Sequence, residues 1–327
     1  MIEKYYSGVI EQIYNRIGKE TRNIVMANYS NDFSIENLEV IRRYQSNEDN
    51  VFFAYSEFSY NTLVGAYEPF LDIICNMHRR FIGGSFDDFQ KECGVYYLHR
   101  QVLNSYYETG ECFREETVLL NEVAYEQRRM TMAIADMLKK LSEVKPLMIV
   151  INRFQMASKS SIETIKYLID NPCANIGIVL GVNAIVKGTD STVEVWDRIV
   201  ESLEDRSAIY YIGSAGPLKN NVKTTNDYEL YITMNFEQSI QEASNIMEFL
   251  DFEQARRGCR IIEHKLKFED AWIDEKSLRR FYMVYARTSV LLGEMSKAIE
   301  LTNEYKALIP ENDSEHYLSL YYFMKGT

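Results

Sequence analysis

Cysteine and long apolar runs are scarce in this chain, and each shortage argues against a class of protein. The five cysteines are an odd number, lie far apart and form no Cys-x-x-Cys pair, which argues against a zinc site and for a reducing compartment. No stretch of 18 apolar residues occurs, so the sequence predicts no membrane span. The first residues, MIEKYYSGVIEQIYNR, lack the apolar core of a signal peptide. We therefore expect a cytoplasmic protein that binds no membrane.

Positive charge is also in short supply. The chain has 36 Lys and Arg against 48 Asp and Glu, which gives a net charge of −12, and its basic pairs are scattered along the sequence. Binding to the phosphate backbone needs an excess of Lys and Arg, so we expect no direct contact between this chain and nucleic acid. Metal ligands are sparse too, since Cys75 and His78 form an i,i+3 pair with no further ligand at metal-site spacing. We expect no metal site.

Five short apolar runs predict a parallel sheet. They are apolar throughout rather than alternating, which is typical of strands buried on both faces by helices. Helical patterns separate them, over Ser34–Tyr44, about Glu115–Glu143 and Ser160–Asp170, the last with a capping-box-like start at Ser160 and Glu163. Such alternation favours a doubly wound α/β domain over residues 1–218. The runs are Asn23–Asn28, Val51–Ser56, Leu147–Asn152, Asn175–Gly181 and Ala208–Gly213.

The character of the chain changes after Pro217. Residues 219–234 are predicted to be a connector, and residues 235–327 are predicted to be helical only. Two pairs of alanines twelve residues apart bracket similar turns, and small residues at this spacing let antiparallel helices approach closely. The alanines are Ala243 and Ala255 in the first copy, and Ala286 and Ala298 in the second.

The second copy resembles a tetratricopeptide repeat. It departs from the pattern at Tyr305, and the 43 residues from Ala255 to Ala298 exceed the usual repeat length, so an ordinary helical hairpin remains the alternative. A last predicted helix, Ser314–Lys325, has no following partner, which suggests a truncated array and leaves association between copies of the chain open. The matching positions are Tyr282, Ala286, Gly293, Ala298 and Pro310.

Four segments in order resemble one family. Tyr67–Phe70 (YEPF), Leu147–Ser161 (LMIVINRFQMASKSS), Asn175–Asn183 (NIGIVLGVN) and Tyr211–Leu218 (YIGSAGPL) look like successive elements of the STAND branch of AAA-like P-loop NTPases. More narrowly, they resemble the sensory module of bacterial regulators that join such a domain to tetratricopeptide repeats and an output domain. The resemblance implies a P-loop NTPase-like parallel sheet followed by tetratricopeptide-like helical hairpins. An unrelated α/β domain that matches by chance is the alternative.

The phosphate-binding loop implied by this resemblance is altered. A working P-loop needs Gly-x-x-x-x-Gly-Lys-Ser/Thr, because the glycines let backbone N–H groups wrap the phosphates and the lysine neutralises them. Here Ala27 and Asp32 replace the glycines, Phe33 replaces the lysine, and only Ser34 stays in register. Loss of the lysine beside a new carboxylate is expected to weaken phosphate binding strongly.

The metal-binding side is altered as well. Asn152 takes the place of the Mg²⁺-binding aspartate, Arg153 the place of the adjacent acid, and Asn183 the place of the sensor arginine. An arginine cannot orient water as a base, and its charge repels the metal. The helical lid and winged helix of the family also have no counterpart in the short connector. The vestigial nucleotide pocket implied by the resemblance comprises Ala27, Asn28, Asp32, Phe33, Ser34, Asn152, Arg153 and Asn183.

Together these changes predict a non-catalytic signalling module. We expect a pseudo-ATPase scaffold without a cofactor, whose helical repeats bind a protein partner, at the sensory front of a larger bacterial regulator. One alternative is a divergent protein that still binds ATP or ADP, or hydrolyses ATP, with Arg153 supplying the charge that Phe33 lacks. Another is a transcription regulator whose DNA-binding part lies outside this chain.

Overall fold

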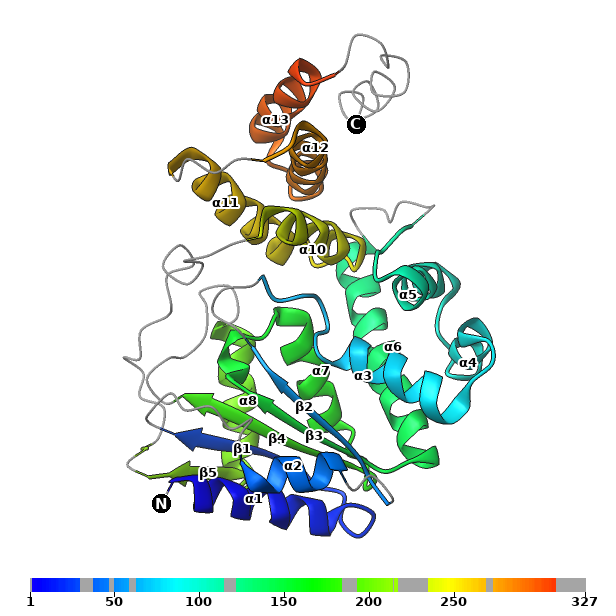
Figure 1. Ribbon diagram of the computed structural model, residues 1–327, viewed down its shortest axis with the longest axis vertical. Helices are drawn as coiled ribbons and strands as arrows, with labels where there is room; N and C mark the ends of the chain where they lie inside the picture. The colour runs from blue at the N-terminus through cyan, green and yellow to red at the C-terminus, as the bar shows by residue number, and fades with distance from the viewer. Residues whose placement is uncertain are drawn as a thin grey trace. The chain divides into compact units, whose positions relative to one another are not determined.

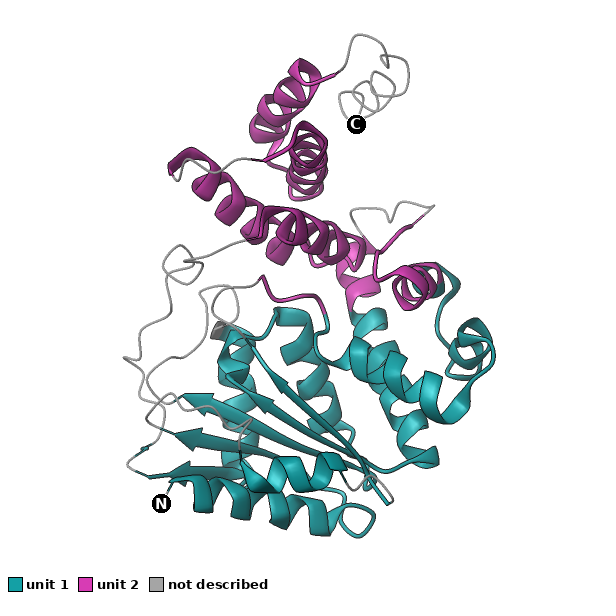
Figure 2. Cartoon of the chain, in the orientation of Figure 1, with its two compact units in different colours: residues 1–60, 67–100, 128–226 teal, residues 61–66, 101–127, 227–327 magenta. Residues whose placement is uncertain are grey.

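The computed structural model describes most of the chain. Two compact units are present, and each is described by itself (Figure 2). The first comprises residues 1–60, 67–100 and 128–226, and the second comprises residues 61–66, 101–127 and 227–327. The described residues are 2–29, 38–46, 50–58, 63–114, 122–183, 193–213, 215–216, 235–268 and 273–309.

The first unit is built on a five-stranded parallel sheet, as the apolar runs predicted. The strand order is β2-β3-β4-β1-β5, and every neighbouring pair is parallel. Each predicted strand is found within one or two residues of its predicted position, because a continuous apolar run has few other ways to bury both faces. The strands are β1 (Ile24–Tyr29), β2 (Phe52–Glu57), β3 (Leu147–Asn152), β4 (Ile176–Asn183) and β5 (Ile209–Ile212).

Helices flank this sheet on both faces (Figure 1). Helices α1 (Ile2–Arg16) and α2 (Glu39–Ser46) pack on one face, where Tyr6, Ile10 and Ile41 are completely buried against the strands. Helices α7 (Lys159–Asp170) and α8 (Val193–Asp205) lie on the other face in Figure 1. The α-helices described between β2 and β3 are α3 (Phe70–Met77), α4 (Phe86–Glu92), α5 (Tyr97–Thr109) and α6 (Val123–Val144).

One predicted helix start is corrected by the structure, and two others lie partly outside the described residues. Helix α7 begins one residue earlier than predicted, and its N-cap is Ser158, whose side chain accepts a hydrogen bond from the N–H of Ser161, so the expected cap at Ser160 and Glu163 was wrong. Helix α2 confirms the second part of the predicted Ser34–Tyr44 helix and continues to Ser46, whereas residues 34–37 lie outside the described part. Helix α6 begins at Val123, and residues 115–121 are likewise not described.

The second unit contains paired helices, as the C-terminal pattern predicted. Helix α10 (Phe236–Glu248) pairs with α11 (Phe252–Phe268), and α12 (Glu275–Leu291) pairs with α13 (Met295–Ala307). The side chains of Ala243, Ala255, Ala286 and Ala298 are buried where these helices meet. Pro310, the predicted connector 219–234 and the predicted last helix 314–325 lie outside the described residues.

Earlier segments of the chain also belong to the second unit. Asn245 on α10 accepts a hydrogen bond from the N–H of Cys112 at 2.9 Å and donates one to the carbonyl of Gly110 at 3.0 Å. Gly258 on α11 faces Leu63 so closely that a Cβ at this position would lie 2.6 Å from the leucine Cδ2. Polar bonds and apolar packing therefore attach residues 63–66 and 110–114 to the C-terminal helices.

Candidate functional site

The carboxyl edge of the sheet holds the candidate site. From β1 the chain crosses β4 and β3 to reach β2, whereas from β4 it crosses β1 in the opposite direction to reach β5. Open α/β sheets bind ligands where two such connections diverge, outside the carboxyl ends of the strands. Here this point lies between the ends of β1 and β4, at Tyr29 and Asn183, which are register partners.

A buried hydrogen bond occupies the position where the resemblance expects a metal-binding aspartate. The Tyr29 hydroxyl at the end of β1 donates to Oδ1 of Asn152 at the end of β3, with 2.6 Å between the two oxygens. Both side chains are completely buried. The oxygen that an aspartate would offer to Mg²⁺ thus belongs to an amide that is used inside the core.

This bond crosses the strand that lies between its two partners. Strand β4 separates β1 from β3, and at this level it carries Gly181. A Cβ on Gly181 would lie 2.9 Å from Asn152 Oδ1 and 2.5 Å from the hydroxyl oxygen of Tyr6. The glycine therefore leaves room for two polar side-chain atoms directly above the sheet.

Tyrosine rings fill the space above the strand ends. The rings of Tyr6 and Tyr29 meet edge to face, with their centroids 6.3 Å apart. Burial raises the pKa of Tyr6 well above its usual value, and the neighbouring Tyr29, Tyr55 and Glu57 raise it further. Tyr6 consequently stays protonated, and this part of the edge is a packed neutral core.

Arg153, directly after β3, is engaged by an acid from the neighbouring strand. It has a left-handed backbone conformation (φ 54°), and its Nη1 lies 3.1 Å from Oε1 of Glu57 at the end of β2. The same nitrogen lies 3.4 Å from the carbonyl oxygen of Phe58. Tyr55 donates a short hydrogen bond to the other carboxylate oxygen of Glu57. The sequence suggested that the positive charge of Arg153 could bind a phosphate. In the structure this charge is balanced by the carboxylate of Glu57.

The remaining polar groups of the edge hold the strand ends together. Nδ2 of Asn28 donates to the carbonyl of Gly216 at 3.1 Å, and the N–H of Asn183 donates to Oε1 of Gln155 at 3.3 Å. Two buried polar atoms at the edge, Oδ1 of Asn28 and Nε2 of Gln155, have no hydrogen-bond partner among the described residues. The two hydrogen bonds attach loops to the strand ends, and one acceptor and one donor at this edge stay unpaired within the described part of the chain.

Two segments that carry the resemblance are joined by hydrogen bonds near the start of α7. The N–H of Tyr67 donates to Oγ of Ser160 at 3.0 Å, and Oγ of Ser161 donates to the carbonyl of Glu68 at 2.7 Å. Tyr67 has a positive φ of 59°, and the following Glu68-Pro69 bond is cis. The serine pair thus anchors the unusual backbone of the Tyr67–Phe70 segment.

The structure brings together five of the eight predicted pocket residues. Ala27, Asn28, Asn152, Arg153 and Asn183 lie at or near the carboxyl ends of adjacent strands, and all but Arg153 are buried. The other three, Asp32, Phe33 and Ser34, lie outside the described residues.

Sequence reasoning missed four residues of this edge: Tyr6, Tyr29, Glu57 and Gly181. Tyr29 and Glu57 directly follow two of the predicted strands, and this position was the signal that could have identified them. Tyr6 had no such signal, because it lies on helix α1, which precedes the first strand and follows no predicted strand end.

The described residues do not fit a magnesium nucleotide. No group of three or more His, Cys, Asp or Glu side chains in this part of the chain could hold a metal ion. Among the described residues at the strand ends, Glu57 is the one carboxylate, and it is paired with Arg153.

No described helix is both long enough and apolar enough to cross a membrane.

Comparisons with known proteins do not assign the chain to a family. Neither the protein-family models nor the curated proteins include a match to this sequence. The structure itself establishes the fold, a parallel α/β domain followed by paired helices.

Proposed function

We propose that this chain is a non-catalytic regulatory module whose α/β domain is a pseudo-ATPase scaffold. The observation that carries the proposal is the buried hydrogen bond between Tyr29 and Asn152. Nucleotide hydrolysis requires a carboxylate at this edge to hold Mg²⁺ and polar groups that orient water. A neutral amide bonded to a buried phenol supplies neither function.

The ion pair between Arg153 and Glu57 supports the same conclusion. Both side chains are mostly shielded from water, with exposed fractions of 21% and 18%. To bind a phosphate, Arg153 would have to leave its carboxylate partner uncompensated in a poorly solvated place, which is costly. Glu57 would also repel the incoming anion.

The paired C-terminal helices supply the proposed protein-binding surface. Stacked helical hairpins form extended surfaces that bind other proteins. Met295 and Ile299 lie one turn apart on α13, with 47% and 60% of their surfaces exposed. These two exposed apolar side chains are the ones that we propose to contact a partner.

The proposed mechanism is conformational. The protein exists in two arrangements, and a protein partner binds the helical hairpins more tightly in one of them. Binding therefore shifts the population toward that arrangement, by an amount that the difference between the two affinities sets. That change controls an output element, which in the resembled regulators is a separate DNA-binding or second-messenger domain.

Calorimetric titration of ATP and ADP, each with and without Mg²⁺, tests the scaffold proposal. We expect no binding heat and no shift of the melting temperature at about 1 mM nucleotide. A dissociation constant below about 100 μM would stabilise the fold by more than about 1 kcal/mol at that concentration and would contradict the proposal. Binding without Mg²⁺ that disappears in Arg153→Gln would favour a nucleotide-binding protein instead.

A gain-of-function variant complements this titration. The double substitution Asp32→Gly with Phe33→Lys restores two residue types of a working phosphate loop. New ATP binding by this variant, with none by the wild type, would support a retained P-loop fold. Circular dichroism spectra that match the wild type would serve as the folding control, and a correctly folded variant that binds no nucleotide would count against the P-loop interpretation.

A further inference from the structure

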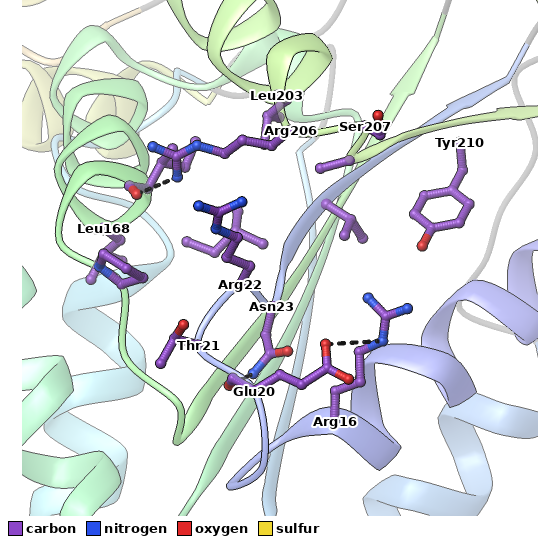
Figure 3. Close-up of a pocket in the computed structure, with 15 residues that line it drawn as sticks. Arg16, Glu20, Thr21, Arg22, Asn23, Leu168, Leu203, Arg206, Ser207 and Tyr210 are labelled. Atoms are coloured by element: carbon purple, nitrogen blue, oxygen red, sulfur yellow. Dashed lines mark hydrogen bonds and ion pairs between the residues drawn. The ribbon is translucent and has the colours of Figure 1, made fainter.

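A pocket of about 220 Å³ opens at the amino ends of β1 and β5, at the edge of the sheet opposite the candidate site (Figure 3). Four segments form it: the end of α1, the loop that leads into β1, the end of α7, and the turn between α8 and β5. All of them belong to the first unit, and all lining residues are described. The proposed function uses none of these segments.

Three arginines from different segments line this pocket. Arg16 ends α1, Arg22 lies in the loop before β1, and Arg206 lies in the turn after α8. Glu20 is the one acid among the lining residues. In a chain with a net charge of −12, this concentration of positive charge stands out.

Two of the arginines are held in place by the protein. Nε of Arg16 lies 3.6 Å from a carboxylate oxygen of Glu20. Arg206 donates to the carbonyl of Ile169 at the end of α7, at 2.5 Å, and its other terminal nitrogen lies 3.9 Å from Asp170. These contacts position the two guanidinium groups and balance part of their charge.

Arg22 has no such partner. Its side chain is exposed and forms no ion pair or hydrogen bond with any residue in the described part of the chain. Figure 3 shows its guanidinium group among the lining residues, with no dashed line to it. An arginine in this state has all five donors available, in a planar arrangement that suits phosphate oxygens.

A buried polar atom adds a second recognition element. Asn23, next to Arg22, is completely buried, and its Nδ2 donates to the carbonyls of Glu20 at 2.6 Å and Ala174 at 3.2 Å. These two bonds fix the amide so that Oδ1 is the free atom. Oδ1 has no hydrogen-bond partner among the described residues. A buried acceptor without a partner is unfavourable, so a ligand hydroxyl or amino group that donates to it would gain affinity.

Apolar side chains complete the walls. Leu168, Ile169 and Leu203 are buried, and Tyr210 presents a partly exposed ring. Such walls lower the local dielectric and strengthen the pull of the arginines on an anion. Because the volume is below the usual range for drug-sized ligands, the ligand must be small.

We propose that this pocket binds a small organic phosphate that carries hydroxyl groups, such as a sugar phosphate. Arg22 binds the phosphate with support from the charges of Arg206 and Arg16, and Asn23 Oδ1 accepts a hydrogen bond from a ligand hydroxyl. This proposal stands independently of the pseudo-ATPase proposal, because its residues lie at the opposite ends of the strands.

Isothermal titration of the full chain with inorganic phosphate, ribose 5-phosphate and ribose tests the proposal. We expect saturable binding of ribose 5-phosphate, weaker binding of inorganic phosphate and none of uncharged ribose. Arg22→Ala should weaken ribose 5-phosphate binding by about tenfold or more, as expected for a charged hydrogen bond. Arg42→Ala, which removes an exposed arginine from α2, is the matched control and should leave the affinity unchanged.

Three results would overturn the proposal. They are no saturable binding of either phosphate, equal binding of ribose and ribose 5-phosphate, and equal loss of affinity in Arg22→Ala and Arg42→Ala. The last would indicate a general charge effect instead of a site. Because Arg22 is exposed, its replacement should leave the fold intact, and a matching melting temperature checks this.

Discussion

The hydroxyl oxygen of Tyr29 lies 2.6 Å from the side-chain oxygen of Asn152, although the strands that carry them are separated by β4. The contact is made across Gly181, where a Cβ would come within 2.9 Å of the same Asn152 oxygen. One buried polar contact thereby joins the ends of β1 and β3 across β4. It lies where the family resemblance of the sequence would place a metal-binding aspartate.

Replacement of Gly181 by alanine should destabilise the first unit. The added methyl group would overlap with the buried hydroxyl of Tyr6 and with Asn152, so we expect a loss of about 1–3 kcal/mol in the free energy of unfolding. Urea denaturation measures this loss. Gly8→Ala is the control, because a Cβ on Gly8 in the middle of α1 would meet nothing within 4 Å, and this variant should gain about 0.5–1 kcal/mol. Equal stability of Gly181→Ala and the wild type would contradict the close approach.

A double-mutant cycle on Tyr29 and Asn152 should reveal their coupling. Tyr29→Phe removes the donor and leaves a buried oxygen without it, so we expect a loss of about 1–3 kcal/mol. In the Asn152→Ala background the same change should cost clearly less. Tyr5→Phe serves as the control, since Tyr5 is 60% exposed and its change should stay within about 0.5 kcal/mol. Strictly additive losses would show that the two side chains do not interact.

The turn between α12 and α13 should require glycine. Gly293 has a φ of 75°, and its N–H and that of Glu294 bond back to the carbonyls of Val290 and Ser289 at the end of α12. Gly293→Ala should therefore cost about 1 kcal/mol or more, because a Cβ is disfavoured in this left-handed conformation. Gly293→Asn should cost less, since asparagine tolerates it better. Thermal unfolding compares the three proteins, and equal stability of the alanine and asparagine variants would count against this explanation.

His78 should make the first unit sensitive to acid. Burial lowers the pKa of His78 below its ordinary value, and the charge of Arg79 lowers it further. The unfolded chain then takes up a proton near pH 6.5 while the folded protein does not, so the free energy of unfolding falls as the pH drops below about 6.5. His78→Phe removes this proton uptake and suits the neighbouring Phe86 and Phe89 rings, whose centroids lie 5.0 and 5.2 Å from that of His78.

Denaturation midpoints at several pH values between about 7.5 and 5 test this expectation. The wild type should lose more stability over this range than His78→Phe does. Parallel curves for the two proteins would show that another group is responsible for the acid sensitivity.

Much of the sheet was predictable from local sequence, and little of the candidate site was. Leu147–Asn152 is a strand at its predicted bounds, and all six residues are buried. A continuous apolar run of this length, bounded by turn signals, is typical of a strand that is covered by helices on both faces. The start of α7 was missed by one residue, since Ser158, Ser160 and Ser161 all suit an N-cap and only the folded geometry selects Ser158.

Asn152 and Arg153 could be picked out as candidate site residues from the sequence, but their partners could not. Tyr29 is 123 residues away from Asn152, and Glu57 is 96 residues away from Arg153. No local pattern links positions so far apart, because their contact depends on the order in which the parallel strands pair.

The sequence by itself determined the parallel α/β class, the strand positions and the paired helices, because these follow from hydrophobic periodicity over a few residues. Tertiary structure alone decided which strands are neighbours, and so which side chains share the carboxyl edge. It also decided that Arg16, Arg22 and Arg206 line one pocket and that residues near Leu63 and Gly110 pack with the C-terminal helices. Such contacts join segments that lie far apart in the chain, so they form and stabilise the protein only when the whole core has assembled.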